Sequence, residues 1–241
     1  DGKKIVTTSS INYPHSVGLL YGTFTDFLGF TPDNDEWKTM ALASFSKSKN
    51  KFDKKMKYIY KLTKDGFELD LSFFDYYLFD KQKSFYNQKL INLFGLPRKR
   101  NTILKSEHYQ IAGALQRSFT EIVFHLLNIA KKKGGGSNKI VIAGGAAMNC
   151  VFNGLLDKNK IYNQNFVPPW PDDLGVSIGA TYLENNNLNK RNSKDVQVYL
   201  GPSYDNKEII SLLNKYKLKF KKPKKISSYI AKKISDGCLI G

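Results

Sequence analysis

Residues 142–149, IAGGAAMN, form the first group whose types and spacing could do chemistry. A strand that ends in Gly144 and Gly145 before a helix presents free backbone N–H groups. These groups can contact phosphate or ribose oxygens, helped by the helix dipole. Asn149 lies one turn into the expected helix and could hydrogen-bond a sugar or a phosphate. A tight strand-to-helix turn without any ligand explains the same residues, so both interpretations stay open at this point.

A second group is the acidic stretch DDLG at 172–175. It is expected in a loop at the carboxyl edge of a strand, where open α/β sheets place ligand and metal groups. Asp173, followed by Gly175, could ligate a divalent cation. The alternative is an acidic N-cap for the helix that follows, for which Asp172 is the candidate.

Other chemistry is sparsely represented. The three histidines, at positions 15, 108 and 125, have no metal-ligand spacing on one helix, and the two cysteines, at 150 and 238, form no C-x-x-C pair. Neither a disulfide framework nor a zinc finger is therefore indicated. No P-loop or G-x-G-x-x-G motif occurs. The basic run 217–225, KLKFKKPKK, could bind phosphate backbones or could be a solvated face.

The elements that must position these groups begin with a strand at 3–11 and a buried helix at 16–30, in which apolar residues recur at intervals of three and four. Gly29 is the expected stop of that helix, and a second short helix follows at 36–45. Asp65-Gly66 predicts a hairpin turn. The rest of 46–106 is aromatic and basic, and we expect it to form a peripheral subdomain of mixed structure.

The clearest helix is expected at 107–133, with Ser106 as its N-cap and one apolar stripe along its length. The apolar run 139–145 predicts a buried strand, parallel to a neighbour, and a helix should open at 146–156. A strand end, an acidic loop and a further helix fill 166–184. This alternation of strands and helices indicates an α/β fold.

The last segments suggest a linker and a new unit. We divide the chain into 1–45, the peripheral subdomain at 46–106, a third segment at 107–184, a polar linker at 185–197 and the new unit at 198–241. That last unit should contain a strand at its start, two helices, and a second strand at 238–241.

The composition is that of an ordinary globular protein apart from its charge. The chain of 241 residues carries 38 Lys and Arg against 21 Asp and Glu, a formal net charge of +17. Such a charge suggests nucleic acid or an anionic membrane as a partner, although it can also reflect the composition of the source organism. No apolar run reaches the roughly 18 residues that span a bilayer, and no signal peptide is visible. We therefore expect a reduced, cytoplasmic protein without a membrane partner.

Four stretches, taken in order, resemble the nodulation-type O-carbamoyltransferases, the family that includes antibiotic carbamoyltransferases. They match the family's P-x-S-L-G-L-x-Y, G-E-x-K-x-M-G-L-A, A-G-G-x-A-L-N-C-x-x-N-G and G-D-x-G-x-x-x-G-A patterns. The stretches are PHSVGLLYGTFTDFLGF (14–30), EWKTMALASF (36–45), IAGGAAMNCVFNGLL (142–156) and PPWPDDLGVSIGA (168–180). Four matches in the right order are far more specific than any one of them.

This resemblance implies an actin-like ATPase fold of the ribonuclease-H-like kind, with two lobes built on mixed sheets and a nucleotide between them. It makes 1–45 the end of the first lobe with helices that face the site, 107–184 the second, nucleotide-binding lobe, and 198–241 the start of the C-terminal carbamoyltransferase domain. It also implies ATP, carbamoyl phosphate as co-substrate and a divalent metal, with iron expected and magnesium the alternative. The implied reaction forms a carbamoyl-adenylate and transfers the carbamoyl group to the hydroxyl of a small-molecule acceptor. Some lysines could then steer these anionic substrates, and nucleic acid becomes an unlikely partner.

Residue by residue, the resemblance gives Gly144, Gly145 and Asn149 a nucleotide-contacting role. It makes Asp173 and Asp1 metal ligands, and it places Glu36 and Lys38 on a helix that faces the site. The chain departs from the family pattern at four positions, where Asp35, Ala41, Ala147 and Asp172 stand in place of the usual residues. The departures at 35 and 172 affect the expected loop geometry more than nucleotide binding.

The family's metal-binding histidine pair and its G-P-R-A-L-G segment are not in these 241 residues. We therefore expect a central fragment, which depends on further parts of the same enzyme and does not turn over by itself. Other enzymes of the actin-like superfamily, a sugar kinase or a threonylcarbamoyl-transfer protein, are the alternatives within the fold. A basic nucleic-acid-binding module without catalysis is the alternative from another class, and it predicts strongly salt-dependent binding.

Overall fold

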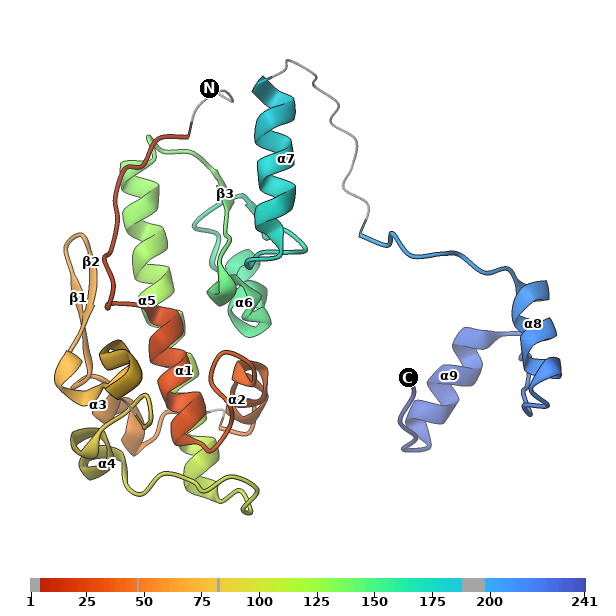
Figure 1. The fold of residues 1–241 in the computed structure, drawn as a ribbon, viewed down its shortest axis with the longest axis horizontal. Coiled ribbons are helices and arrows are strands. Elements are labelled where there is room, and N and C mark those ends of the chain that lie inside the picture. The colour runs from red at the N-terminus through yellow and green to blue at the C-terminus, as the bar shows by residue number, and fades with distance from the viewer. Residues whose placement is uncertain (1–4, 47, 82, 188–197) are drawn as a thin grey trace. The chain divides into compact units, whose positions relative to one another are not determined.

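The computed structural model describes residues 5–46, 48–81, 83–187 and 198–241. The chain divides into a larger unit, Asp1–Asn192, and a smaller unit, Ser193–Gly241 (Figure 1). The architecture is mixed α/β, with helices dominating and two small two-stranded sheets in the described part of the larger unit. The α/β class expected from the sequence is thus confirmed at this level.

Two helices form the centre of the larger unit. Helix α1 (Val17–Phe27) begins where the Ser16 hydroxyl accepts a hydrogen bond from the Leu19 N–H, and its apolar residues are almost all buried. The chain turns at Gly29, which has φ +73° and passes so close to the Arg98 carbonyl that a side chain would not fit. The predicted helix and its predicted stop are both confirmed.

Helix α5 (Ser106–Lys133) is the longest element and carries the predicted apolar stripe. Its N-cap is Lys105, so the expectation of Ser106 was wrong by one residue. The cause is His108, whose ring Nδ1 accepts a hydrogen bond from the Lys105 N–H at 2.9 Å and so draws Ser106 into the first turn. His108 is buried as a result.

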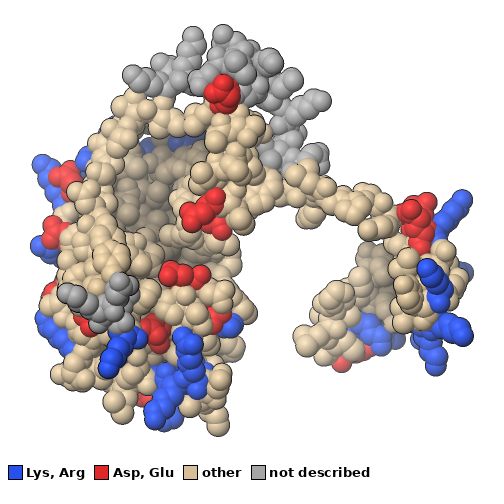
Figure 2. All heavy atoms as spheres, viewed as in Figure 1, with Lys and Arg blue, Asp and Glu red and all other residues tan. Residues whose placement is uncertain are grey.

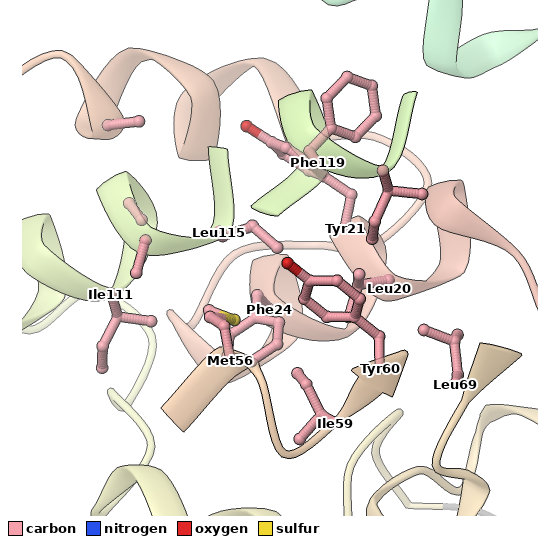
Figure 3. Packing of buried hydrophobic residues seen from close by; sticks show 14 of the residues in the cluster. Leu20, Tyr21, Phe24, Met56, Ile59, Tyr60, Leu69, Ile111, Leu115 and Phe119 are labelled. Carbon is pink, nitrogen blue, oxygen red and sulfur yellow. The ribbon is translucent and has the colours of Figure 1, made fainter. Parts of the chain in front are cut away.

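Short elements surround these two helices: α2 (Glu36–Ala43), α3 (Lys51–Met56), α4 (Gln88–Phe94) and the 3-10 turns η1 (Leu71–Phe73) and η2 (Tyr76–Lys81). Strands β1 (Tyr60–Thr63) and β2 (Gly66–Leu69) form the hairpin that Asp65-Gly66 predicts, with Tyr60 opposite Leu69. Residues 46–106, which we expected to be peripheral, contribute Met56, Ile59 and Tyr60 to the core of α1 and α5 (Figure 3).

The second sheet carries the Gly-Gly motif. Strands β3 (Lys139–Val141) and β4 (Gln164–Phe166) run parallel, with Lys139 opposite Gln164, as the sequence predicts. Strand β3 is shorter than expected and not fully buried, since Val141 is 67% exposed. The reason is that β4 is the only strand beside it among the described residues. Turn η3 (Gly145–Met148), helix α6 (Cys150–Asn159) and helix α7 (Gly175–Asn187) complete the unit.

The smaller unit contains α8 (Asn206–Lys215) and α9 (Ile226–Ser235), and neither helix has a buried residue. The strands expected at its start and at 238–241 do not form in residues 198–241, and residues 5–11 of the larger unit are likewise unpaired. A strand needs a partner that completes its hydrogen-bond ladder, and no such partner lies beside these segments in the described chain. Most of the linker expected at 185–197 lies outside the described residues.

Across the described ranges, no helix combines the length and the apolar character that crossing a membrane requires. On the face that Figure 2 presents, both units carry Lys and Arg as well as Asp and Glu. Residues 198–241 hold 10 lysines against Asp205, Glu208 and Asp236, which is +7 of the chain's +17.

Candidate functional site

The structure brings the Gly-Gly motif and the acidic loop together. The parallel ladder continues past β3, where the Ile142 N–H donates to the Phe166 carbonyl at 3.0 Å. The Gly144 N–H then donates to the Pro171 carbonyl at 2.5 Å, in the loop that leads to Asp173. Both motifs therefore lie just beyond the carboxyl ends of parallel strands, the position where open α/β sheets bind ligands.

The turn itself is open to a ligand. Gly144 has φ +99°, a conformation that favours glycine, and both glycines are exposed. No other atom lies within 4 Å of the place where a Cβ of Gly144 or Gly145 would stand. The N–H groups of Gly145 and Ala146 donate to no acceptor within the described residues. These free donors, with clear space beside them, suit the phosphate of a nucleotide.

Asn149 is not one turn into a helix, as the sequence suggested, but is the N-cap of α6. Its Oδ1 accepts the Phe152 N–H at 2.9 Å and Gln116 Nε2 at 3.0 Å, while its Nδ2 donates to Gln116 Oε1 at 3.0 Å. The residue is 8% exposed, so its amide faces the interior. In this geometry Asn149 stabilises the turn through its side-chain hydrogen bonds. Direct contact of Asn149 with a nucleotide stays a prediction.

Two residues of this site were missed at the level of sequence. The Tyr21 hydroxyl donates to Gln116 Oε1 at 2.9 Å, so α1, α5 and the start of α6 meet in one buried network. Burial, reinforced by the nearby Glu36 carboxylate, holds the pKa of Tyr21 well above its usual value. In the sequence, the residue that could have indicated this network is Gln116, a polar residue beside the apolar stripe of the predicted helix 107–133.

The predicted helix 36–45 lies beside this region. The Cys150 thiol at the start of α6 is 3.8 Å from the Met40 sulfur of α2. Glu36 Oε1 accepts the Asp33 N–H at 2.8 Å and faces Gly22 of α1. No hydrogen bond or ion pair in the described residues joins Glu36 or Lys38 to the Gly-Gly turn.

Lys38 is engaged by a residue at which the chain departs from the family pattern. Its Nζ lies 2.7 Å from Asp35 Oδ1, and Asp35 also accepts the Thr31 N–H at 3.1 Å. The bond from Lys38, followed by that from Thr31, lowers the pKa of Asp35 below its usual value. A phosphate that contacts Lys38 would have to compete with this carboxylate, and the role of Lys38 stays a prediction.

The described residues do not form a metal site. Asp173 is exposed, Asp1 lies outside the described residues, and the described ranges contain no group of three His, Cys, Asp or Glu that could hold an ion. Asp172 Oδ1 accepts the Leu174 N–H at 3.3 Å, just before α7. That contact suits the alternative in which Asp172 shapes the start of a helix.

Comparison with known proteins agrees with the pattern of motifs. Residues 1–182 match the family model described as "Carbamoyltransferase N-terminus". The nodulation protein NolNO of Sinorhizobium fredii is 25% identical over the whole chain, which covers 34% of that protein. The nodulation protein NolO of Bradyrhizobium diazoefficiens is 29% identical over 60% of the chain, corresponding to 27% of its own length.

An uncharacterized protein of Synechocystis sp. is 32% identical over 88% of the chain and 35% of its own length. The chain therefore spans about a third of the length of these curated relatives.

Proposed function

Because this chain belongs to the nodulation-type carbamoyltransferase family, we propose that it forms part of an ATP-using O-carbamoyltransferase. The proposed enzyme takes a carbamoyl group from carbamoyl phosphate and transfers it, through a carbamoyl-adenylate, to the hydroxyl of a small-molecule acceptor. The observation that carries the proposal is the meeting of two family motifs at the open Gly-Gly turn, through the Gly144 N–H and the Pro171 carbonyl.

The proposed reaction balances in three steps. Water cleaves carbamoyl phosphate to carbamate and phosphate. A carbamate oxygen then attacks the α-phosphorus of ATP, forming carbamoyl-adenylate and releasing pyrophosphate. The acceptor hydroxyl finally attacks the carbamoyl carbon, loses its proton, and releases AMP. The activated intermediate supplies AMP as a far better leaving group than the hydroxide of free carbamate would be.

In this scheme the residues of this chain bind and orient the nucleotide. The free N–H groups of Gly145 and Ala146 would hold a phosphate oxygen by hydrogen bonds that need no rearrangement, because the turn is already formed. Lys38 would supply positive charge nearby after exchanging Asp35 for a phosphate. Glu36, on the same helix, would hold the start of α2 beside α1, because its Oε1 accepts the Asp33 N–H and faces Gly22 of α1.

Several finer features belong to the same proposal. We infer that the larger unit holds the end of the first lobe (1–45) and the second lobe (107–184) of an actin-like ATPase fold, and that further parts of the same enzyme complete the active site. A divalent metal, iron or magnesium, is part of the same proposal, with Asp173 and Asp1 as the residues that would hold it. Asp173 is the described residue at which a ligand role should be tested.

A matched pair of glycine variants tests the proposed nucleotide contact. Gly145→Val adds a side chain to open space beside the free N–H groups, whereas Gly154→Ala adds one to open space on α6. We expect Gly145→Val to weaken ATP binding at least tenfold with the fold intact, and Gly154→Ala to leave it unchanged. Titration calorimetry with ATP and circular dichroism of both variants make the comparison.

Equal ATP affinity in the wild type and Gly145→Val would remove the turn from the nucleotide site. Absence of AMP and pyrophosphate release when the whole enzyme meets ATP, carbamoyl phosphate and hydroxyl acceptors would contradict the proposed reaction. Binding of mixed-sequence DNA that falls steeply with salt, without nucleotide binding, would instead favour the nucleic-acid alternative.

A further inference from the structure

The buried contact between Gln116 and Asn149 links the longest helix to the Gly-Gly turn. Two hydrogen bonds of 3.0 Å run between the two side-chain amides in opposite directions, so each amide fixes the orientation of the other. Tyr21 adds a bond of 2.9 Å to Gln116 Oε1 from the neighbouring helix. All three residues are less than 9% exposed.

The surroundings of this contact are aromatic. The Tyr21 and Phe119 rings meet edge to face at 5.5 Å, and Phe119 meets Phe152 in the same way at 6.0 Å. In such surroundings water does not replace a lost hydrogen bond, so a polar group there is costly unless it is paired. Apolar side chains would pack these helices without that risk, so the amides contribute orientation rather than burial.

The orientation reaches the turn through Asn149. The same Oδ1 that accepts from Gln116 also accepts the Phe152 N–H, which begins α6. The Asn149 N–H donates to Ala146, and the Ala147 N–H donates to Gly144. A rotation of the Asn149 side chain would therefore loosen the segment that presents the free N–H groups of Gly145 and Ala146.

We propose that Gln116 is a positioning residue for the nucleotide site. It holds the Asn149 amide, and through it the Gly-Gly turn, in the arrangement that receives phosphate, while Tyr21 holds the amide of Gln116. This inference rests on the proposed nucleotide binding at the turn, but it also makes a statement about the turn itself that can be measured without any ligand.

The test compares Gln116→Met with Ile122→Val in the full chain. Methionine keeps the length and volume of glutamine and removes both amide contacts. Ile122 is fully buried on the same helix and outside the network, so Ile122→Val lowers stability without touching Asn149. Two quantities are measured on folded protein: the dissociation constant for ATP with magnesium, and hydrogen exchange of the hydrogen-bonded amides of Ala147, Asn149 and Phe152.

We expect Gln116→Met to raise the ATP dissociation constant about tenfold and to speed exchange at these three amides, because two hydrogen bonds that hold Asn149 are lost. Tyr21→Phe should give a smaller change in the same direction. Ile122→Val should change neither quantity beyond its effect on global stability.

The outcomes separate the two proposals. If the wild type binds ATP and Gln116→Met binds it equally well, Gln116 does not position the site. If the wild type binds no ATP, the proposed function fails, and exchange alone decides the positioning role. Unchanged exchange at the amides of Ala147, Asn149 and Phe152 in Gln116→Met overturns the inference in either case.

Discussion

Helix α5 of the larger unit and helix α8 of the smaller unit both carry an apolar stripe, but only the stripe of α5 is buried in a core. Leu115 of α5 has no exposed surface, because α1, α2 and α3 pack around it, while Leu212 of α8 is 60% exposed. The sequence pattern of a helix therefore predicts which face is apolar, but it does not identify the element of the fold that covers this face.

The comparison extends to charge. All six ion pairs of Lys or Arg with a carboxylate among the described residues lie in the larger unit. Residues 198–241 carry an excess of lysine, and no Lys there lies within ion-pair distance of a carboxylate of the described chain. Packing and charge pairing thus coincide in one unit and are both lacking in the described part of the other.

The largest expected difference is in leucine truncation. Leu115→Ala should lower the free energy of unfolding by about 2–5 kcal/mol, because it leaves a cavity in a packed core. Leu212→Ala should change it by less than about 0.5 kcal/mol, since its side chain meets water already. Denaturant titrations of both variants measure the difference, and equal losses would show that something covers α8 in solution.

Local patterns predicted the elements whose contacts are close in sequence. The helices at 16–30 and 107–133 and the hairpin at Asp65-Gly66 are confirmed, since caps, stripes and turn residues act within a few positions. The strand predicted at 3–11 does not form in residues 5–11, and the strand predicted at 238–241 does not form either. The reason is the opposite one, because a strand forms only beside a partner, and β-branched or apolar residues in one segment do not identify that partner.

The candidate site, like the fold, could be predicted from the sequence only where the signal lies within a short segment. The motif matches found the turn and the acidic loop, and the structure brings them together. The pair of Tyr21 and Gln116 could not be predicted, because 95 residues separate them and only the packing of α1 on α5 makes them neighbours. Lys38 and Asp35, in contrast, lie three positions apart at the start of a helix, so their ion pair could have been predicted from the sequence.

The second prediction compares two helix caps. Asn149 caps α6 from a buried position and also bonds Gln116, whereas Asp205 caps α8 from the surface in a reciprocal pair with Glu208. Asn149→Ala should cost about 2–3 kcal/mol, since it also leaves Gln116 Nε2 without its hydrogen-bond acceptor. Asp205→Ala should cost about 0.5–1 kcal/mol of helix stability.

Hydrogen exchange of the first-turn amides of α6 and α8 measures both costs. A loss for Asn149→Ala no larger than that for Asp205→Ala would mean that the buried network adds nothing to the cap.

The third and smallest effect concerns charge and pH. Arg117 of α5 holds Asp53 of α3 by two bonds, Nε to Oδ1 at 2.6 Å and Nη2 to Oδ2 at 2.9 Å. Partial burial tends to raise the pKa of Asp53, but the Arg117 bonds and the Asn50 N–H outweigh it and lower the pKa below the usual value. The stabilisation is therefore complete above the unfolded-state pKa and is lost as the pH falls through the lower, folded-state pKa.

Arg117→Met should therefore cost about 1–2 kcal/mol at neutral pH. The difference from the wild type should shrink as the pH falls below about 4, where Asp53 of the unfolded chain is protonated. Lys215→Met in α8 is the matched control, because no carboxylate lies within ion-pair distance of Lys215 in the described chain, and its small effect should not vary with acid. Urea titrations between pH 3 and pH 7 give these differences directly. A constant difference for Arg117→Met across that range would mean that its guanidinium acts by packing, and the contrast between the two units would then be one of burial alone.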